Sequence, residues 1–144
     1  MRKRLVSVLL LIAIFASITG NALASDYDIM PCFNNTMMTS SNFTITTSGE
    51  ATVTATYNAY RDRFTSARVT SYIEKRTLGI FWSRVDIGQP NNEWVDTSTE
   101  YADIFGHVIQ LTKTGTYRAT VVYEISGTGG ATDVIDYVQE RTYS

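Results

Sequence analysis

The stretch "LTKTGTYRATVVYEI", from Leu111 to Ile125, decides the fold class. A short polar turn, residues 113–116, is followed by Tyr117 and then by side chains that alternate between apolar and polar. Successive side chains of a strand point to opposite sides, so this alternation is typical of a strand with one buried face. The side chains predicted to face the core are Tyr117, Ala119, Val121, Tyr123 and Ile125.

The same alternation recurs along most of the chain. "EATVTATYNAY" places apolar residues at the odd positions of 51–59 and mostly threonine at the even positions. Further β-type segments follow at a spacing of about 8–14 residues, separated by turn signals such as "GQPNN". No stretch after Ser25 carries a helical apolar stripe. Seven to eight short strands without helices predict an all-β, antiparallel sandwich.

Four residues match the tyrosine corner of immunoglobulin-like sandwiches in order and spacing: Leu111, Gly115, Tyr117 and Ala119. In that corner a leucine ends one strand, a turn crosses to the other sheet, and the tyrosine hydroxyl bonds back to the turn. The residue two places after the tyrosine is a disulfide cysteine in antibody domains and is Ala119 here, with Val53 or Ala55 as its counterpart. The sequence therefore predicts an immunoglobulin-like sandwich without that disulfide.

The N-terminus has the three parts of a secretory signal. A basic start, residues 1–4, precedes an apolar run of 14 residues, 5–18, and small residues precede a cleavage site after Ala24. The apolar run is shorter than the ~20 residues that span a bilayer, which disfavours a membrane anchor. We therefore expect a secreted, extracellular product. The predicted parts are a helical signal peptide, 1–24, an N-terminal arm, 25–41, and the β-sandwich domain, 42–144.

Removal of the signal peptide makes the chain more acidic, because its formal charge is −2 before cleavage. Nine Lys and Arg then stand against fourteen Asp and Glu, a formal charge of −5. Phosphate binding needs clustered positive charge, so we expect no nucleic-acid partner and no membrane contact after cleavage. Cys32 is the only cysteine, which excludes an internal disulfide. A free thiol is favoured over a disulfide-linked dimer through Cys32, and no cofactor is expected.

Three segments carry a resemblance to a known group: "ATVTATY", then "IEKR" with "IFWSRVDIG" and "EWV", then "LTKTGTYRATVVY". Over residues 51–142 the chain resembles small secreted proteins of Gram-positive Firmicutes that carry a domain of unknown function. A basic-ended strand, a Trp-x-x-Val pair and a late Gly-x-Tyr-Arg recur in that group. The resemblance implies export and a β-sandwich, and it supplies neither an activity nor site residues.

The residues that carry hydrolytic or metal chemistry are sparse. His107 is the only histidine and lies between Phe105 and Ile109 in an alternating segment. A zinc site needs more nitrogen or sulfur ligands, and the Gly-x-Ser-x-Gly pattern of a serine nucleophile is missing from the sequence. A half-buried strand histidine is favoured over a catalytic base, and no catalytic or metal-binding residue is predicted.

An acidic cluster supports an alternative of a different class, a small secreted hydrolase. Glycoside hydrolysis needs two carboxylates about 5–10 Å apart, and such a pair would come from Glu93, Asp96, Glu100 and Asp103. These acids with Asp86, Asn91 and Asn92 would alternatively bind calcium. A solvated loop is favoured over both. A secreted toxin or inhibitor is a third alternative.

Aromatic and arginine residues point to binding. Trp82, Trp94 and several tyrosines, Tyr101 among them, lie near predicted outward faces or turns, where rings stack on sugars or anchor protein interfaces. For both tryptophans, packing over the sheet edge as a minor core is favoured over exposure, since sandwich domains commonly bury a tryptophan. "YRDRFTSAR" adds arginines that suit an anionic polymer, although a solvated turn is favoured. The sequence thus predicts a non-catalytic binding or surface-interaction module for an extracellular protein or glycan. The contact candidates are Trp82, Trp94, Tyr60, Tyr72, Arg61, Arg63 and Arg68.

Overall fold

The computed structural model describes residues 32–144; the predicted signal peptide and residues 25–31 of the predicted arm lie outside this range. The elements are β1 (Thr36–Ile45), β2 (Glu50–Ala59), β3 (Phe64–Thr77), β4 (Phe81–Arg84), the 3-10 helix η1 (Pro90–Asn92), β5 (Trp94–Ser98), β6 (Ala102–Gln110), β7 (Gly115–Gly127) and β8 (Asp133–Tyr143). No helix in the described range is long and apolar enough to span a bilayer.

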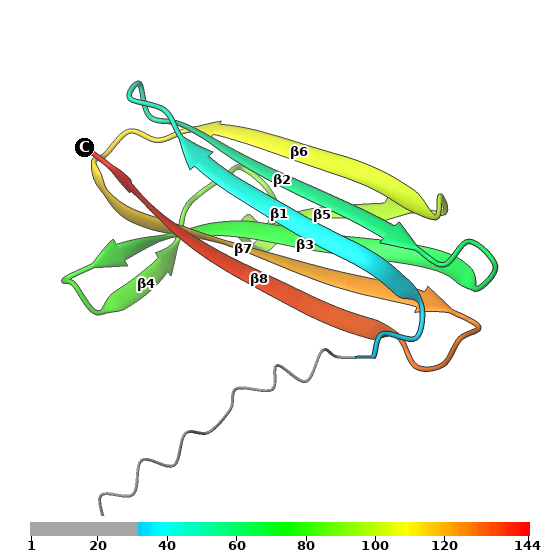
Figure 1. The fold of residues 1–144 in the computed structure, drawn as a ribbon. Coiled ribbons are helices and arrows are strands. Elements are labelled where there is room, and N and C mark those ends of the chain that lie inside the picture. The colour runs from blue at the N-terminus through cyan, green and yellow to red at the C-terminus, as the bar shows by residue number, and fades with distance from the viewer. Residues whose placement is uncertain (1–31) are drawn as a thin grey trace, which may run out of the picture. The chain divides into compact units, whose positions relative to one another are not determined.

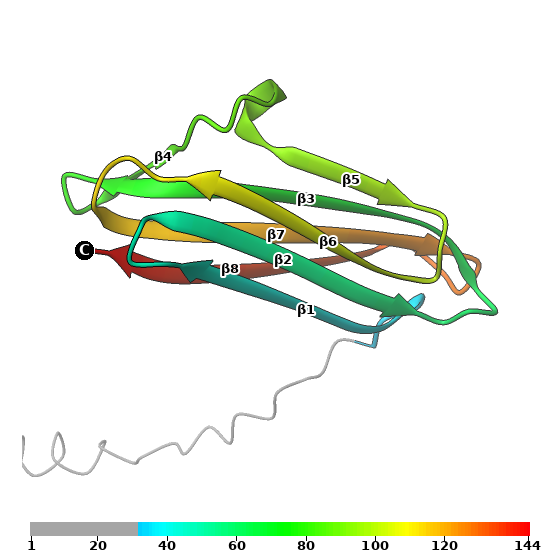
Figure 2. The same ribbon diagram turned by 90° about the horizontal axis from the view of Figure 1, so that it is seen from above.

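The strands form two antiparallel sheets that lie face to face (Figure 1 and Figure 2). One has three strands in the order β1-β2-β6, and the other has five, in the order β4-β3-β7-β8 with β5 also paired to β3. β4 pairs with residues 74–77 of β3 and β5 with residues 67–71, so both occupy the same edge in succession. The predicted all-β, antiparallel sandwich of about eight strands is confirmed.

The core lies between the two sheets and follows the predicted alternation. All odd-numbered residues of β2 from Ala51 to Ala59 are buried, and so are those of β7 from Tyr117 to Ile125. Val69, Ser71 and Ile73 of β3 add a third buried row. The side chains of these rows alternate strictly, so their packing fixes which face of each strand is inward.

The predicted tyrosine hydrogen bond is present at the start of β7. Tyr117 is buried, and its hydroxyl donates to the backbone carbonyl of Lys113 in the preceding turn. Leu111, the first residue after β6, is also buried. Burial raises the pKa of Tyr117, so the phenol keeps its proton at neutral pH and remains a donor.

Replacing Tyr117 with phenylalanine should lower the free energy of unfolding by about 1–2 kcal/mol, because the Lys113 carbonyl loses a part-buried donor. Urea unfolding measures the change as a shift in midpoint with an unchanged slope. The matched control is Tyr101→Phe, at an exposed ring, which should change stability by less than about 0.5 kcal/mol. Equal effects of the two variants would contradict a stabilising role for the Tyr117 hydroxyl.

β1 begins at Thr36, six residues before Asn42, where the sequence placed the start of the domain. This first half of β1 has no apolar alternation because its inward residues are polar and meet polar partners. The Thr39 hydroxyl lies 2.9 Å from that of Tyr137, and Gln139 Nε2 donates to the carbonyl of Ser41 at 2.8 Å. Both partners belong to β8, some 98 residues away, so the local pattern hides the strand.

Candidate functional site

The candidate site is the outward face of the five-stranded sheet, the side turned away from the core. Strand register places Trp82, Tyr72 and Arg68 on this face, so it unites three of the predicted contact residues. The residues of the outward face are Arg68, Thr70, Tyr72, Glu74 and Arg76 of β3, Trp82 and Arg84 of β4, Val95 and Thr97 of β5, Arg118, Thr120, Val122 and Glu124 of β7, and Val134, Asp136, Val138 and Glu140 of β8.

A row of arginine–aromatic contacts crosses one end of this face. The Arg118 guanidinium carbon lies 4.3 Å from the centre of the Trp82 ring, and that of Arg76 lies 5.7 Å from the same ring. Arg84 stands 3.3 Å from the centre of the Tyr72 ring. A guanidinium at such distances is attracted to the ring face, which orders both partners.

Ion pairs hold two of these three arginines, Arg118 and Arg84, in place. Arg118 Nε lies 2.6 Å from Glu74 Oε2, and Arg84 Nη1 lies 2.9 Å from Glu93 Oε1. Register explains the first pair, because Glu74 and Arg118 are direct cross-strand partners on β3 and β7. Each guanidinium is thus fixed by both a ring and a carboxylate, which reduces the entropy lost when a ligand binds.

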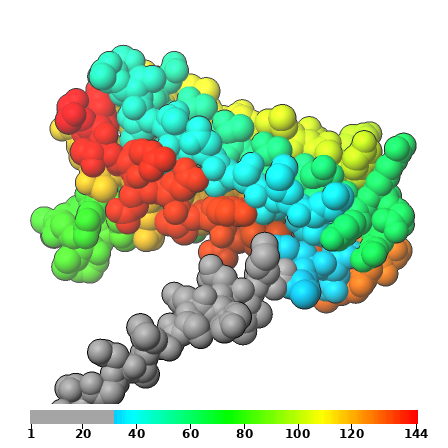
Figure 3. Space-filling view, in the orientation of Figure 1, coloured from blue at the N-terminus to red at the C-terminus, as the bar shows by residue number. Residues whose placement is uncertain are grey.

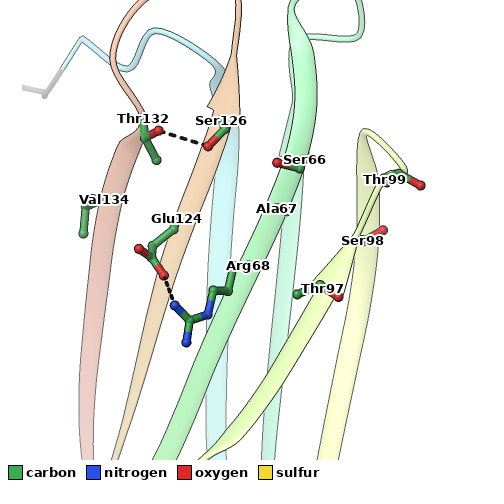
Figure 4. Close-up of a pocket in the computed structure, with 10 residues that line it drawn as sticks. All are labelled: Ser66, Ala67, Arg68, Thr97, Ser98, Thr99, Glu124, Ser126, Thr132 and Val134. Carbon is green, nitrogen blue, oxygen red and sulfur yellow. Dashed lines mark hydrogen bonds and ion pairs between the residues drawn. The ribbon is translucent and has the colours of Figure 1, made fainter.

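The other end of the outward face is an open groove of about 570 Å³ (Figure 4). Arg68 and Glu124 point toward one another in it, with Arg68 Nη1 3.5 Å from Glu124 Oε2. The groove is otherwise rich in hydroxyl groups, which donate and accept hydrogen bonds and suit a neutral polar ligand. The hydroxyl-bearing residues are Ser66, Thr97, Ser98, Thr99, Ser126 and Thr132.

Trp94 lies elsewhere, on the inward side of β5. Its ring stacks on His107 of β6 at 4.8 Å between centres and 2° between planes, and it packs against the core. His107 Nε2 lies 2.7 Å from Asp96 Oδ2. This cluster joins β5 of one sheet to β6 of the other. His107 is half-buried on a strand, as expected.

Three further candidates gather at the turn between β2 and β3. The Arg63 guanidinium lies 4.8 Å from the Tyr60 ring centre and donates to the carbonyl of Asn34 at 3.3 Å. Arg61 lies 5.3 Å from the ring centre of Tyr101. Arg68, by contrast, lies on the outward face with Glu124. The structure therefore does not bring the three arginines of "YRDRFTSAR" into one cluster.

The acids of the hydrolase alternative contact different neighbours. Glu93 pairs with Arg84, and Asp96 with His107. The Asp103 carboxylate accepts from the amide of Ile104 and stands four residues from His107 on β6, about 13 Å along the strand. Among residues 32–144 no three His, Cys, Asp or Glu are arranged to hold a metal ion. Cys32 is exposed, with a free thiol.

Sequence reasoning missed the three arginines of the row, Arg76, Arg84 and Arg118, and also Glu74, which pairs with Arg118. The sequence alternation did show the side of the strand on which two of them lie. Arg84 is two residues after Trp82 and so lies on the same side of β4, and Arg118 lies on the side of β7 opposite to Tyr117. What brings them together is the register of β3 against β4 and β7, which no local pattern predicts.

Comparison of the chain with known protein families, with curated proteins and with solved structures gave no match.

Proposed function

We propose that this chain is a secreted, non-catalytic binding module that contacts an extracellular protein through the outward face of its five-stranded sheet. The observation that carries the proposal is the ordered row of Trp82, Tyr72 and their arginines. Trp, Tyr and Arg are the residues most enriched at binding hot spots, and here they share one solvent-facing surface. The signal peptide predicted for residues 1–24 supports secretion.

We further propose that the domain is immunoglobulin-like. The strand order supports this, because β1, β2 and β6 form one sheet and β3, β7 and β8 the other, as do the corresponding strands of that fold. The Tyr117 hydrogen bond supports it too. Ala119 and Val53 line one narrow gap between the sheets, where antibody domains place their disulfide.

The size of the outward face suits a protein partner. Four strands at about 4.8 Å spacing and a β7 of about 40 Å give roughly 800 Å², the area that each partner of a standard interface buries. Exposed valines lie between the charged groups, which matches the mixed apolar and polar composition of such interfaces. These valines are Val95, Val134 and Val138.

A glycan is the second candidate ligand, and the groove favours it. Its hydroxyl groups and the Arg68–Glu124 pair offer both donors and acceptors to sugar hydroxyls. A toxin or inhibitor would be a special case of the protein binder. The hydrolase is a weaker candidate, because Glu93 and Asp96 are already engaged by Arg84 and His107.

Trp82→Ala should reduce binding at least tenfold, because truncating a hot-spot residue costs more than about 1.4 kcal/mol. The test immobilises the chain from Ser25 onward and captures proteins from the extracellular fraction of a culture, with a glycan array in parallel. Thr54→Ala, on the outward side of the other sheet, is the control and should bind as the parent does. Thermal unfolding checks that both variants are folded.

A species retained by the parent and by Thr54→Ala and lost by Trp82→Ala supports the proposal. Binding that survives Trp82→Ala and disappears in Thr54→Ala would place the site on the three-stranded sheet and overturn it. Signal on the glycan array that depends on Arg68 rather than Trp82 would favour the glycan candidate.

A further inference from the structure

The hairpin between β3 and β4 ends in exposed apolar side chains. We call residues 77–81 the finger. Leu78 is 85% exposed, Ile80 71% and Phe81 58%. Scattered single apolar residues are normal on a protein surface, but three within four positions form a patch that marks an interaction site. Figure 1 and Figure 3 show this hairpin projecting from the body of the sandwich, so neighbouring elements do not cover it.

The finger has a defined conformation that is fixed by hydrogen bonds. Leu78 and Gly79 both have left-handed backbone conformations, with φ of 53° and 75°, and the amide of Ile80 donates to the carbonyl of Thr77 at 3.3 Å. Asn or Gly normally occupies the position of Leu78, because a larger side chain is strained there. Arg76 Nε donates to the Gly79 carbonyl at 2.7 Å and braces the tip. A strained leucine held at a tip indicates a functional demand.

The root of the finger is basic, although the domain is acidic overall. A hollow of about 370 Å³ lies beside it, lined by Lys75, Arg84 and Lys113 with one carboxylate, Asp86. Within residues 32–144, Lys75 and Lys113 form no ion pair with an acid. Neither lysine is therefore neutralised by a carboxylate, although the Lys75 ammonium also lies 5.6 Å from the centre of the Tyr117 ring. Trp82, the residue after the finger, is of the type that lies at the headgroup level of membranes.

We propose that the finger docks the protein on an anionic phospholipid bilayer. Leu78, Ile80 and Phe81 enter the boundary between headgroups and acyl chains, and the lysines of the basic hollow lie against lipid phosphates. An apolar tip above a basic collar is the arrangement by which surface-bound segments combine apolar burial with attraction to anionic lipid. A groove in a protein partner would accept the apolar tip but gives no reason for the unpaired lysines at its root. The formal charge of −5 led us to expect no membrane contact. The proposal departs from that expectation because the side chains beside the finger carry more positive than negative charge.

The test uses sedimentation with vesicles of phosphatidylcholine and phosphatidylglycerol, and with vesicles of phosphatidylcholine alone. The chain from Ser25 onward, free of the apolar leader, should bind the mixed vesicles and release them at high salt. The double variant Leu78→Ser, Ile80→Ser should bind at least about tenfold less. Lys75→Gln and Lys113→Gln should each weaken binding by about fivefold. Val108→Ser, at an apolar position on β6 that is 60% exposed, is the control.

Retained thermal stability of the double variant excludes misfolding as the cause of lost binding. Vesicle binding that is absent in the parent chain, or unchanged in the double variant, would overturn the proposal. The finger and the outward face are separable: the double variant should keep the protein capture that Trp82→Ala loses. A double variant that still sediments with vesicles but no longer captures protein would assign the finger to the protein partner instead.

Discussion

Asp133→Ala should lower the free energy of unfolding by about 4 kcal/mol. Asp133 is 6% exposed, and its carboxylate accepts the backbone N–H groups of Asn34, Asn35 and Thr36 at 2.8, 2.7 and 2.9 Å. It also accepts the Thr36 hydroxyl at 2.9 Å. Removing it leaves several buried donors without an acceptor, and each such donor costs about 1–3 kcal/mol before water relaxes into the site. Urea unfolding at neutral pH measures the loss.

The effect of Asp133 should depend on pH. Burial by itself raises the pKa of this carboxyl, but the hydrogen bonds from Asn34, Asn35 and Thr36 outweigh burial and hold it below its ordinary value. A lowered native pKa contributes stability that is fully present above the unfolded-state pKa. That stability is lost as the pH falls through the lowered native pKa. The difference between parent and Asp133→Ala should therefore shrink in acid.

The matched control for Asp133 is Asp136→Ala, three residues along β8 at an exposed position. It should change the free energy of unfolding by less than about 0.5 kcal/mol at neutral pH. A stability difference for Asp133→Ala that stays constant down to strongly acidic pH would contradict the assignment. So would a loss below about 1 kcal/mol, the scale of a single ordinary hydrogen bond.

The parts of the fold that could be predicted from sequence are the strands in which the alternation of residue types alone shows which side chains face the core. β2 and β7 alternate over their whole buried rows, so local pattern was enough to orient them. The Tyr117 hydrogen bond was predictable because it joins residues only four positions apart, Tyr117 and Lys113. The start of β1 was not, because Thr39 and Ser41 gain their inward role only from β8.

The candidate site needed information that no local segment holds. The alternation along β4 places Trp82 and Arg84 on one side of that strand. Their neighbour Arg118 belongs to β7, and it reaches them only because β3 pairs with both β4 and β7 in the observed register. For Trp94 the structure has the interpretation that the sequence favoured, packing as part of a minor core. Its surroundings in sequence are polar, and it points inward because His107 of β6 offers a flat ring to stack on. Long-range pairing, rather than propensity, decided both cases.

Gly127→Ala should lower the free energy of unfolding by about 3 kcal/mol or more. A Cβ at Gly127, the last residue of β7, would overlap the backbone carbonyl oxygen of Arg63 and lie 2.6 Å from Asn35 Oδ1. Neither group can yield cheaply. The Arg63 carbonyl belongs to the turn before β3 and accepts the amide of Thr128, while Asn35 is fully buried and bonded to the Ala131 carbonyl. Overpacking against fixed backbone costs about 1–3 kcal/mol, and the broken hydrogen bonds add to it.

Gly106→Ala makes the same chemical change with the opposite expected sign. Gly106 lies in the middle of β6, and a Cβ there would meet no atom within 4 Å. Because glycine loses more backbone entropy on folding than alanine, this variant should gain about 0.5 kcal/mol. Urea midpoints of the two variants, measured together, separate steric overlap from strand propensity. If Gly127→Ala changed stability no more unfavourably than Gly106→Ala, the clash near Asn35 and Arg63 would have to relax freely. A large loss of stability at Gly127 alone would mean that the β7–β8 loop, the β2–β3 turn and Asn35 pack rigidly against one another at this end of the sandwich.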